Sequence, residues 1–353
     1  MASQLQMEGA PDHKIVLVNA QRLDFDQRLN FTKLALRGVV ERHYEDAPTD
    51  DQIVACAEGA TVLVTKEIGV SAELIARLPA SVRLICEAGT GYNNVDLPAA
   101  QERGIAVTNV PEYSSTAVAQ LVLTFLLDFS ASMARQQRML AAGDRSHFGP
   151  ANIQLPMVEL EGKTIGLVGG RGKIGTQVAR LCMTLGMHVI VSTRSIGDET
   201  AVETLRPLGE SGPEVRRELT ESLEDLLRRS DFVSLHCPLT PATRHLMGAA
   251  EFGAMKDSAL LINTARGAIV DQAALIAALG TEGQPSQIAG AALDVQDPEP
   301  PADDSPLYTL PNVQLTPHIG WKRFETRQRL IDTVAANIAA FQDGDAQNVV
   351  TSS

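Results

Sequence analysis

Four side chains that could carry out acid–base chemistry or bind an anion lie just after short apolar segments in the second half of the chain. They are Arg266, Asp294, Glu299 and His318. An imidazole can donate or accept a proton near neutral pH, and a planar guanidinium can bind a carboxylate through two parallel hydrogen bonds. If the apolar segments are parallel strands, all four lie at carboxyl ends of strands, where open α/β sheets bind ligands. Each residue alone is more often structural, so the prediction depends on the combination.

A glycine-rich run, GLVGGRGKIG, offers a place for a nucleotide. Gly170, Gly172 and Gly175 fit the pattern G-x-G-x-x-G, after a predicted strand and at the start of a predicted helix. Glycines there allow a tight turn and a close approach of the backbone to a pyrophosphate, whose oxygens the amides of Lys173 and Ile174 can bind. We therefore predict a dinucleotide site rather than a glycine-rich turn without a ligand.

The residues after the next strand bear on which dinucleotide binds. An NAD site usually carries Asp or Glu there, and this acid accepts hydrogen bonds from the ribose 2′-hydroxyl. Thr193 and Arg194 occupy that place in this chain. Because a guanidinium binds a phosphate well, we expect NADP(H) to be preferred, with NAD(H) as the second candidate. The alternative is that Arg194 is a solvated surface charge.

Alternating strands and helices must position these residues. Short β-branched segments separated by helical periodicity indicate βαβ units around parallel sheets. The segments lie at 14–18, 61–65, 84–86 and 106–110 in the first half, and at 164–169, 188–192, 231–237, 259–265, 289–295 and 313–318 in the second. The predicted fold class is α/β, with two doubly wound parallel-sheet domains.

Two predicted helices do more than connect strands. Segment 115–133 is apolar nearly all round, so it must be buried between domains or between subunits, and from it we predict a homodimer. Segment 323–343 places Leu330, Val334 and Ile338 on one face and ends at a glycine. We expect this last helix to pack back on the first domain.

The composition argues against several classes of partner. The chain of 353 residues has a formal net charge of −13 and no basic cluster, which argues against nucleic acid or an anionic membrane. Cys56, Cys86, Cys182 and Cys237 lie far apart without metal-ligand spacing, which indicates reduced thiols in the cytoplasm and no metal site. The N-terminus lacks the apolar segment of a signal peptide, and no apolar run reaches the about 18 residues of a membrane span.

Seven stretches together resemble the D-isomer-specific 2-hydroxyacid dehydrogenases, most closely the hydroxypyruvate and glyoxylate reductases. In chain order they are GTGYNNVDLPAA (89–100), TNVPEYSSTAVAQ (108–120), GKTIGLVGGRGKIG (162–175), DFVSLHCPLTPAT (231–243), INTARGAIVD (262–271), AALDVQDPEP (291–300) and LTPHIGW (315–321). The resemblance implies a Rossmann cofactor domain, residues 117–320, inserted into a flavodoxin-like substrate domain made of residues 12–116 and 321–353.

The resemblance also implies an activity, the reduction of a small 2-keto acid such as hydroxypyruvate or glyoxylate to the D-2-hydroxy acid. His318 would donate the proton, Glu299 would pair with its imidazole, and Arg266 would bind the substrate carboxylate. Main-chain amides in the loop with Thr90 and Gly91 would bind the same carboxylate. Further cofactor contacts are implied for Cys237, Pro238, Thr243, Thr264, Ala265, Asp294 and Gly320.

Three departures from the family pattern leave alternatives open. The turn GGRGKIG has one residue more than usual, so Gly169 and Gly170 compete for the first glycine position. Thr193 replaces the usual acid. Segment 195–225 is longer than usual, and would either shape a 2′-phosphate pocket or form a surface loop.

Related functions are open to different degrees. Formate dehydrogenases of this fold carry Gln where Glu299 stands, which argues against formate as the substrate. D-lactate-type activity stays open, because the sequence does not rank the keto acids. The alternative outside catalysis is a dinucleotide-sensing, corepressor-like binding protein of the same fold.

Overall fold

The chain folds into two compact units. The computed structural model describes residues 13–149, 155–194, 202–205, 215–280 and 285–351. Unit 1 consists of Met1–Ser114 and Trp321–Ser353, and unit 2 of Ser115–Gly320. One boundary lies two residues before the expected 116/117, and the other coincides with the expected 320/321. Unit 2 is therefore continuous in sequence, whereas unit 1 is completed by the C-terminal segment.

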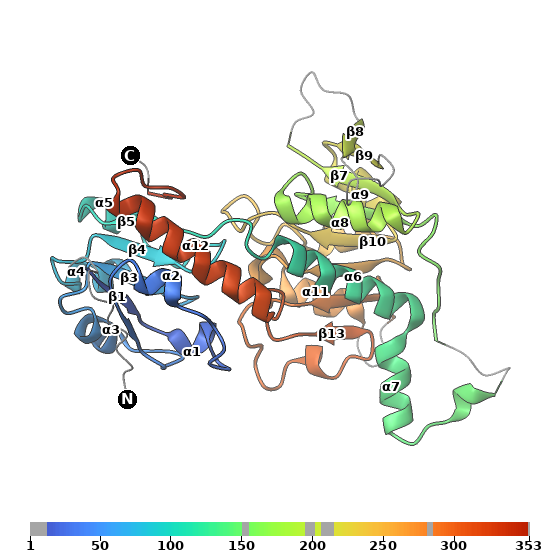
Figure 1. The fold of residues 1–353 in the computed structure, drawn as a ribbon. Helices are drawn as coiled ribbons and strands as arrows, with labels where there is room; N and C mark the ends of the chain where they lie inside the picture. Colours follow the sequence, from blue (N-terminus) through green and yellow to red (C-terminus); the bar gives the residue numbers. More distant parts are fainter. Residues whose placement is uncertain (1–12, 150–154, 195–201, 206–214, 281–284, 352–353) are drawn as a thin grey trace. The chain divides into compact units, whose positions relative to one another are not determined.

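Unit 1 contains a five-stranded parallel sheet in the order β2-β1-β3-β4-β5, the flavodoxin-like order (Figure 1). Its strands are β1 (Lys14–Leu17), β2 (Val39–Arg42), β3 (Val62–Thr65), β4 (Leu84–Glu87) and β5 (Ala106–Thr108). The four strands predicted here are confirmed. The edge strand β2 was not predicted, because its four residues, VVER, are too short and half polar to show a β pattern.

Helices cover both faces of this sheet. One face packs against α1 (Ala20–Leu23), α2 (Thr32–Ala35) and α12 (Phe324–Gln342), and the other against α3 (Asp50–Cys56), α4 (Ala72–Arg77) and α5 (Leu97–Glu102). Helix α12 fully buries Leu330, Val334 and Ile338 in this core, as its periodicity predicted. Burial of each such side chain contributes about 1.5–3 kcal/mol, so the C-terminal helix is a structural part of unit 1.

Unit 2 contains an eight-stranded sheet in the order β13-β12-β11-β10-β6-β7-β9-β8 (Figure 1). Its strands are β6 (Thr164–Val168), β7 (His188–Ser192), β8 (Val202–Leu205), β9 (Val215–Thr220), β10 (Phe232–Leu235), β11 (Leu260–Asn263), β12 (Gly290–Leu293) and β13 (Val313–Leu315). Every neighbouring pair is parallel except β8 and β9. The strand order reverses between β6 and β10, and ligands bind at such a switch point in doubly wound sheets.

The segment 195–225 is not only a loop. It contains β9, which pairs with β7, and β8, which adds an antiparallel edge to the otherwise parallel sheet. Residues 195–201 and 206–214 of this segment lie outside the described part of the chain. The sheet is therefore parallel, as predicted, except at this one antiparallel edge.

Helices also cover both faces of the sheet in unit 2. One face packs against α6 (Ser115–Ala131) and α8 (Lys173–Thr184), and the other against α9 (Leu223–Arg229), α10 (Ala249–Ala254) and α11 (Gln272–Leu279). Three short 3₁₀ turns complete the described elements: η1 (Ser146–Phe148), η2 (Gly267–Ile269) and η3 (Pro306–Tyr308).

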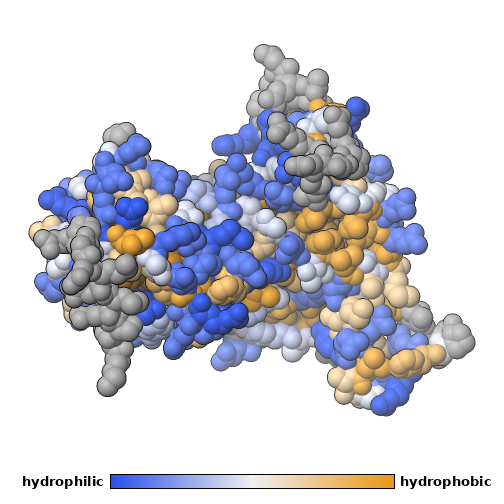
Figure 2. All heavy atoms as spheres, viewed as in Figure 1, coloured by the Kyte–Doolittle hydropathy of each residue, from blue (hydrophilic) through white to orange (hydrophobic). Residues whose placement is uncertain are grey.

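The apolar segment 115–133 forms a helix that ends earlier than predicted. Ser132 adopts a left-handed conformation, with φ of 50°, and the chain bends by 64° into α7 (Met133–Ala141). Most apolar side chains of α6 pack inside unit 2, but Leu127 and Met133 stay about half exposed. Figure 2 shows apolar residues gathered over this part of unit 2. No single described helix is long and apolar enough to cross a membrane, and α6 and α7 reach that length only as this bent pair.

Candidate active site

The glycine-rich turn joins β6 to α8, and its glycines have distinct roles. Gly169 has a φ of 78°, and a Cβ there would lie 2.7 Å from the backbone nitrogen of Cys237. Gly170 packs on Val191 of β7, and a Cβ on Gly175 would lie 2.5 Å from the Cα of Gly170. Gly169 therefore makes the left-handed turn, and Gly170 allows the helix to approach the strand.

The start of α8 suits a phosphate group. Gly172 is the N-cap residue, and it has no side chain to cap the amides of Lys173 and Ile174. A Cβ on Gly172 would meet only the Gly169 carbonyl oxygen, at 3.5 Å, so the side of the turn is open. The amino end of a helix carries a partial positive charge that favours anions. The residues present thus fit the pyrophosphate of a dinucleotide.

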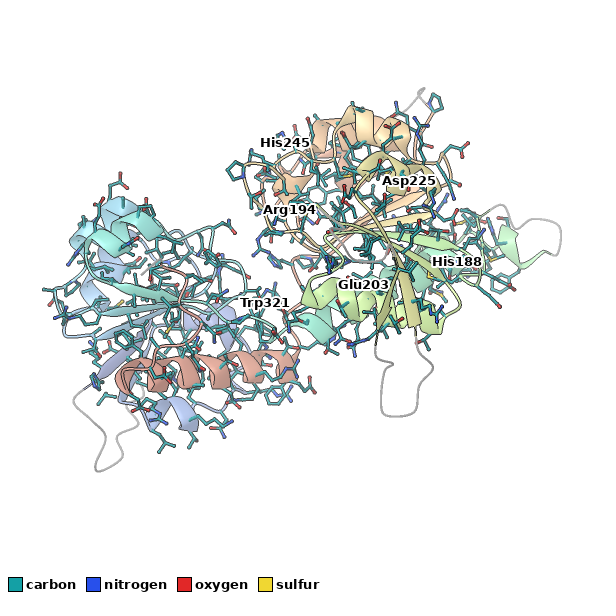
Figure 3. The ribbon with its side chains drawn as sticks, turned by 90° about the horizontal axis from the view of Figure 1, so that it is seen from above. His188, Arg194, Glu203, Asp225, His245 and Trp321 are labelled. Carbon is teal, nitrogen blue, oxygen red and sulfur yellow. The ribbon has the colours of Figure 1, made fainter. Side chains whose placement is uncertain are left out.

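The end of β7 carries the two residues on which the cofactor prediction rests. The Thr193 amide donates to the Thr220 carbonyl oxygen at 2.9 Å, which extends the pairing of β7 with β9. Arg194 follows and is exposed. Figure 3 shows Arg194 at the end of β7 and Glu203 on β8. The position of Arg194 is compatible with either a phosphate ligand or a surface charge.

The loop after β10 folds on itself. The Thr243 hydroxyl donates to the Pro238 carbonyl oxygen at 2.6 Å and accepts from the Thr240 amide at 2.8 Å. Burial raises the pKa of the Cys237 thiol, which is consistent with an unreactive lining residue. At the end of the neighbouring strand β11, the Thr264 hydroxyl is buried without a hydrogen-bond partner among the described residues. A bound ligand could supply that partner.

Arg266 lies at the end of β11, in a loop that packs closely against the loop after β12. The Asn263 side chain binds both ends of this turn, because it accepts from the Ala265 amide and donates to the Arg266 carbonyl oxygen. A Cβ on Gly267 would lie 1.9 Å from the Gln296 carbonyl oxygen, so the loops after β11 and β12 touch through their backbones. The Arg266 guanidinium donates to the Ala265 carbonyl oxygen at 2.7 Å.

His318 and Glu299 come together after β13 and β12, which are adjacent strands. Nδ1 of His318 lies 2.8 Å from Oε1 of Glu299. Both side chains remain partly exposed, at 22% for His318 and 37% for Glu299, so a ligand could reach them. Because Nδ1 is engaged by the carboxylate, Nε2 is the ring nitrogen suited to exchange a proton with a ligand.

Asp294 fixes the loop that carries His318. Its carboxylate is 2% exposed and accepts from the Thr316 hydroxyl at 2.6 Å and from the amides of Ile319 and Gly320 at 2.8 and 2.9 Å. Burial raises the pKa of Asp294, and these hydrogen bonds oppose that rise. The observed contacts are those of a loop anchor, which is a structural role. Its predicted contact with the cofactor stays a prediction.

The loop with Thr90 and Gly91 follows β4 in unit 1. The Asn109 side chain donates to the Thr90 carbonyl oxygen at 2.8 Å, and the Thr90 hydroxyl donates to the Val110 carbonyl oxygen at 3.1 Å. Within the described chain, the amides of Thr90 and Gly91 make no hydrogen bond. They could therefore bind an anion, as the resemblance implies.

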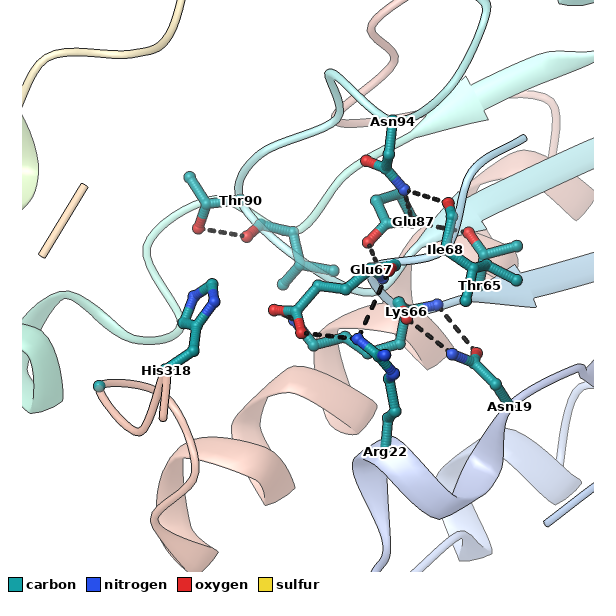
Figure 4. Close-up of polar contacts among 12 residues, drawn as sticks. Asn19, Arg22, Thr65, Lys66, Glu67, Ile68, Glu87, Thr90, Asn94 and His318 are labelled. Carbon is teal, nitrogen blue, oxygen red and sulfur yellow. Dashed lines mark hydrogen bonds and ion pairs between the residues drawn. The ribbon is translucent and has the colours of Figure 1, made fainter. Parts of the chain in front are cut away.

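A buried ionic cluster under this loop was not predicted. Lys66 and Glu87, drawn in Figure 4, are 2% and 1% exposed. The Lys66 ammonium lies 2.7 Å from Glu67 and 3.9 Å from the Trp321 ring centre. Glu87 accepts hydrogen bonds from the Thr65 hydroxyl, the Glu67 amide and the Asn94 side chain. A Cβ on Gly89 would lie 3.3 Å from Glu87 and 3.4 Å from Lys66.

Opposing effects set the ionisation of this cluster. Burial alone would lower the pKa of Lys66, but the acidic groups of Tyr113, Glu67 and Glu87 raise it. Burial raises the pKa of Glu87, and Lys66 and the hydrogen bonds oppose that rise. Two sequence patterns could have indicated this cluster: Lys66 directly follows the apolar strand in VLVTK, and Glu87 ends the apolar strand in LICE.

Metal and thiol chemistry gain no support from the described residues. Within them, no three His, Cys, Asp or Glu side chains cluster so as to hold a metal ion. All four cysteines are free, and burial raises the pKa of Cys86 and of Cys182 to about 12.

Comparisons with known proteins bear on the family of this chain. Residues 123–320 match the family model "D-isomer specific 2-hydroxyacid dehydrogenase, NAD binding domain". The chain is 36% identical to a glyoxylate reductase of Aeropyrum pernix over 85% of each chain, and 32% identical to a glycerate dehydrogenase of Methylorubrum extorquens over 96% of this chain and 98% of that one.

A solved structure is also similar over nearly the whole length. It is an NADPH-dependent glyoxylate/hydroxypyruvate reductase of Sinorhizobium meliloti in complex with NADP and malonate, with a TM-score of 0.77, 26% identity, and coverage of 96% of this chain and 97% of that chain. The turn at β6, the strand order and the full-length relatives lead to one assignment. The chain belongs to the family of D-isomer specific 2-hydroxyacid dehydrogenases, whose members are oxidoreductases.

Proposed function

We propose that this protein uses a nicotinamide dinucleotide to reduce a small 2-keto acid, hydroxypyruvate or glyoxylate, to the D-2-hydroxy acid. The observation that carries the proposal is the 2.8 Å contact between His318 and Glu299, at the carboxyl edge of the sheet that also bears the glycine-rich turn. The names of the relatives, glyoxylate reductase and glycerate dehydrogenase, support this substrate class. When bound, the dinucleotide supplies the hydride.

The chain's own residues supply the proton and hold the anion. His318 delivers a proton from Nε2 to the carbonyl oxygen, and Glu299 stabilises the protonated imidazole and fixes its orientation. Arg266 binds the substrate carboxylate with its planar guanidinium. The amides of Thr90 and Gly91 bind the same carboxylate.

For the cofactor, we propose a preference for NADP(H) over NAD(H). Thr193 and Arg194 stand at the end of β7, where an NAD site usually carries an acidic residue, and this exchange favours a phosphate on the ribose. The amides of Lys173 and Ile174 bind the pyrophosphate beside Gly170, Gly172 and Gly175. The nicotinamide end is lined by residues from the loops after β10 to β13: Cys237, Pro238, Thr243, Thr264, Ala265, Asp294 and Gly320.

We also propose a homodimer in the cytoplasm. The apolar face of α6 supports a dimer only weakly, because most of it packs within unit 2. A better reason is the set of exposed apolar side chains around α7, which includes Leu140 and Phe148, the latter 76% exposed. A cavity of about 320 Å³ beside α7, lined in part by Phe129, Val158 and Leu260, could receive a side chain of a second copy.

Steady-state reduction tests the function. Purified protein is mixed with NADPH or NADH and, separately, with glyoxylate, hydroxypyruvate or pyruvate, and the absorbance of the reduced dinucleotide is followed. Sustained consumption with a 2-keto acid supports the reductase, and the pyruvate arm tests D-lactate-type activity. Tight dinucleotide binding without turnover of any keto acid would instead favour the sensing protein.

A further inference from the structure

Arg217, on β9, is a buried cation that the proposed chemistry does not use. Its side chain is 5% exposed. Nη1 donates to the Gly170 carbonyl oxygen at 2.8 Å and to the Thr176 hydroxyl at 3.2 Å. Gly170 belongs to the glycine-rich turn, and Thr176 to the first turn of α8. Burial of a charge is costly unless it is paired and hydrogen-bonded, so this arrangement needs a reason.

Glu203 supplies the pairing and extends the contact to a second arginine. Its Oε2 accepts from both Nε and Nη2 of Arg217, at 2.7 and 2.6 Å, so two short hydrogen bonds between charged groups join the pair through one oxygen. Its Oε1 lies 2.7 Å from Nη2 of Arg171. Glu203 and Arg217 are cross-strand partners in the β8–β9 pair, so the strand register holds them together.

The triad Arg171–Glu203–Arg217 links two departures from the family pattern. Arg171 lies in the lengthened glycine-rich turn, and Glu203 and Arg217 lie in the unusually long segment after β7. The triad also lies beside β7, because Arg217 precedes Glu218, the register partner of Ile190, and bonds to Gly170, which packs on Val191 near the end of β7. The resemblance places the adenosine ribose at that end.

We propose that this triad is a specificity element for the 2′-phosphate of NADP(H), an inference that rests on the proposed function. The triad carries a net charge of +1, and Arg194 at the end of β7 adds a second positive charge. A phosphomonoester brings close to two negative charges near neutral pH, whereas a ribose hydroxyl brings none. Arg171 binds the 2′-phosphate, Glu203 holds Arg171 in place, and Arg217 fixes the turn that all dinucleotides use.

Dissociation constants, not turnover, test this division of roles. The full-length protein and its variants are titrated with NADPH and NADH, and with the fragments 2′,5′-ADP and 5′-AMP, which lack nicotinamide. Arg171→Met should weaken binding of NADPH and 2′,5′-ADP about tenfold or more, as expected for loss of a hydrogen bond between charged groups. Binding of NADH and 5′-AMP should change less than about twofold, because neither ligand carries the 2′-phosphate whose hydrogen bond to Arg171 is lost.

Two further variants separate specificity from turn geometry. Arg217→Met should weaken the binding of NADPH and of NADH alike. If Arg217→Met does not fold, Arg217→Lys, which keeps the positive charge, should weaken both dinucleotides to a smaller extent. Arg216→Met is the matched control, because Arg216 is the exposed neighbour on β9 and should leave every constant unchanged. The affinity for NADPH should also fall more steeply with added KCl than the affinity for NADH, and Arg171→Met should remove that difference.

The outcomes distinguish this inference from the function on which it rests. Equal weakening of NADPH and NADH by Arg171→Met, or no weakening of either, overturns the specificity element and leaves the reductase intact. Normal dinucleotide affinities with no keto-acid reduction overturn the reductase, while the comparison of constants still decides the role of Arg171. Failure of the wild-type protein to bind either dinucleotide overturns both.

Discussion

Nδ1 of His318 and Oε1 of Glu299 lie 2.8 Å apart although 19 positions separate the two residues. Pairing of β12 with β13 brings their loops to one edge of the sheet. The buried carboxylate of Asp294 accepts from the Thr316 hydroxyl before His318 and from the amides of Ile319 and Gly320 after it. His318 itself has a φ of 50°, a conformation that few residues other than glycine adopt readily. The loop thus presents one imidazole in a fixed orientation.

His318→Asn should abolish most of the proposed activity without disturbing the loop. Asparagine tolerates positive φ but cannot transfer a proton, so kcat should fall by about 10²- to 10⁴-fold. Affinity for NADPH should stay the same, as measured by titration. His245→Asn is the matched control, because His245 also has positive φ, at 52°, and is exposed. Similar losses of kcat in both variants would show that His318 is not the proton donor.

His236 should make stability depend on pH. Burial lowers the pKa of His236 to about 4, and its Nε2 has no hydrogen-bond partner among the described residues. The unfolded state therefore binds more protons between about pH 6.5 and pH 4, so stability falls as the pH falls through that range, by up to roughly 3 kcal/mol.

His236→Gln should remove this part of the pH dependence. Unfolding free energies at pH 7 and pH 4.5 measure it, with His188→Gln, an exposed histidine on β7, as the control. Equal losses on acidification in wild type and His236→Gln would contradict the assignment.

Lys66→Met should strongly destabilise unit 1. Removal of the ammonium leaves the carboxylates of Glu67 and Glu87 without their buried cation, which typically costs about 3–5 kcal/mol. Arg77→Met breaks an exposed ion pair with Asp51, and such pairs contribute about 0–1 kcal/mol. Chemical denaturation followed by the fluorescence of Trp321, which contacts Lys66, measures both variants. A small effect of Lys66→Met, comparable with that of Arg77→Met, would mean that the cluster does not need its cation.

Phe148→Asp should weaken the proposed dimer. A charge on an apolar surface that is buried in an interface is costly, so the dissociation constant measured by sedimentation should rise by at least about tenfold. Leu36→Asp, at an exposed apolar position of unit 1, should leave it unchanged. A wild-type protein that sediments as a monomer at micromolar concentration contradicts the proposal directly.

Residues whose surroundings are local could be predicted from the sequence better than residues whose partners are distant. Ten of the thirteen described strands followed from apolar segments, and the turn before α8 followed from its glycines, because those patterns reflect local geometry. Strands β8 and β9 were missed because they are held by pairing and by the Glu203–Arg217 contact, neither of which leaves an apolar pattern. The early end of α6 depends on the backbone of Ser132, a residue type that is common in helices.

The candidate site shows the same division. The sequence indicated that Arg266, Glu299 and His318 follow strands, and the structure brings Glu299 and His318 into contact, with Arg266 at the end of the adjacent strand β11. The loop-anchoring contacts of Asp294 could not be predicted from the sequence, because they depend on amides more than 20 positions away. Lys66 and Glu87 were missed because charged residues usually lie at the surface.

Unit 1 is formed by two segments that lie on either side of unit 2 in the sequence, and this affects how it folds during synthesis. Its core requires Leu330, Val334 and Ile338 of α12, and the amide of Val350 bonds to the Val107 carbonyl oxygen of β5. A ribosome delivers these residues only after all of unit 2 has been translated, and domains generally fold as units during synthesis. Unit 2 can thus fold first on the nascent chain, whereas unit 1 keeps an apolar face uncovered until α12 has been translated.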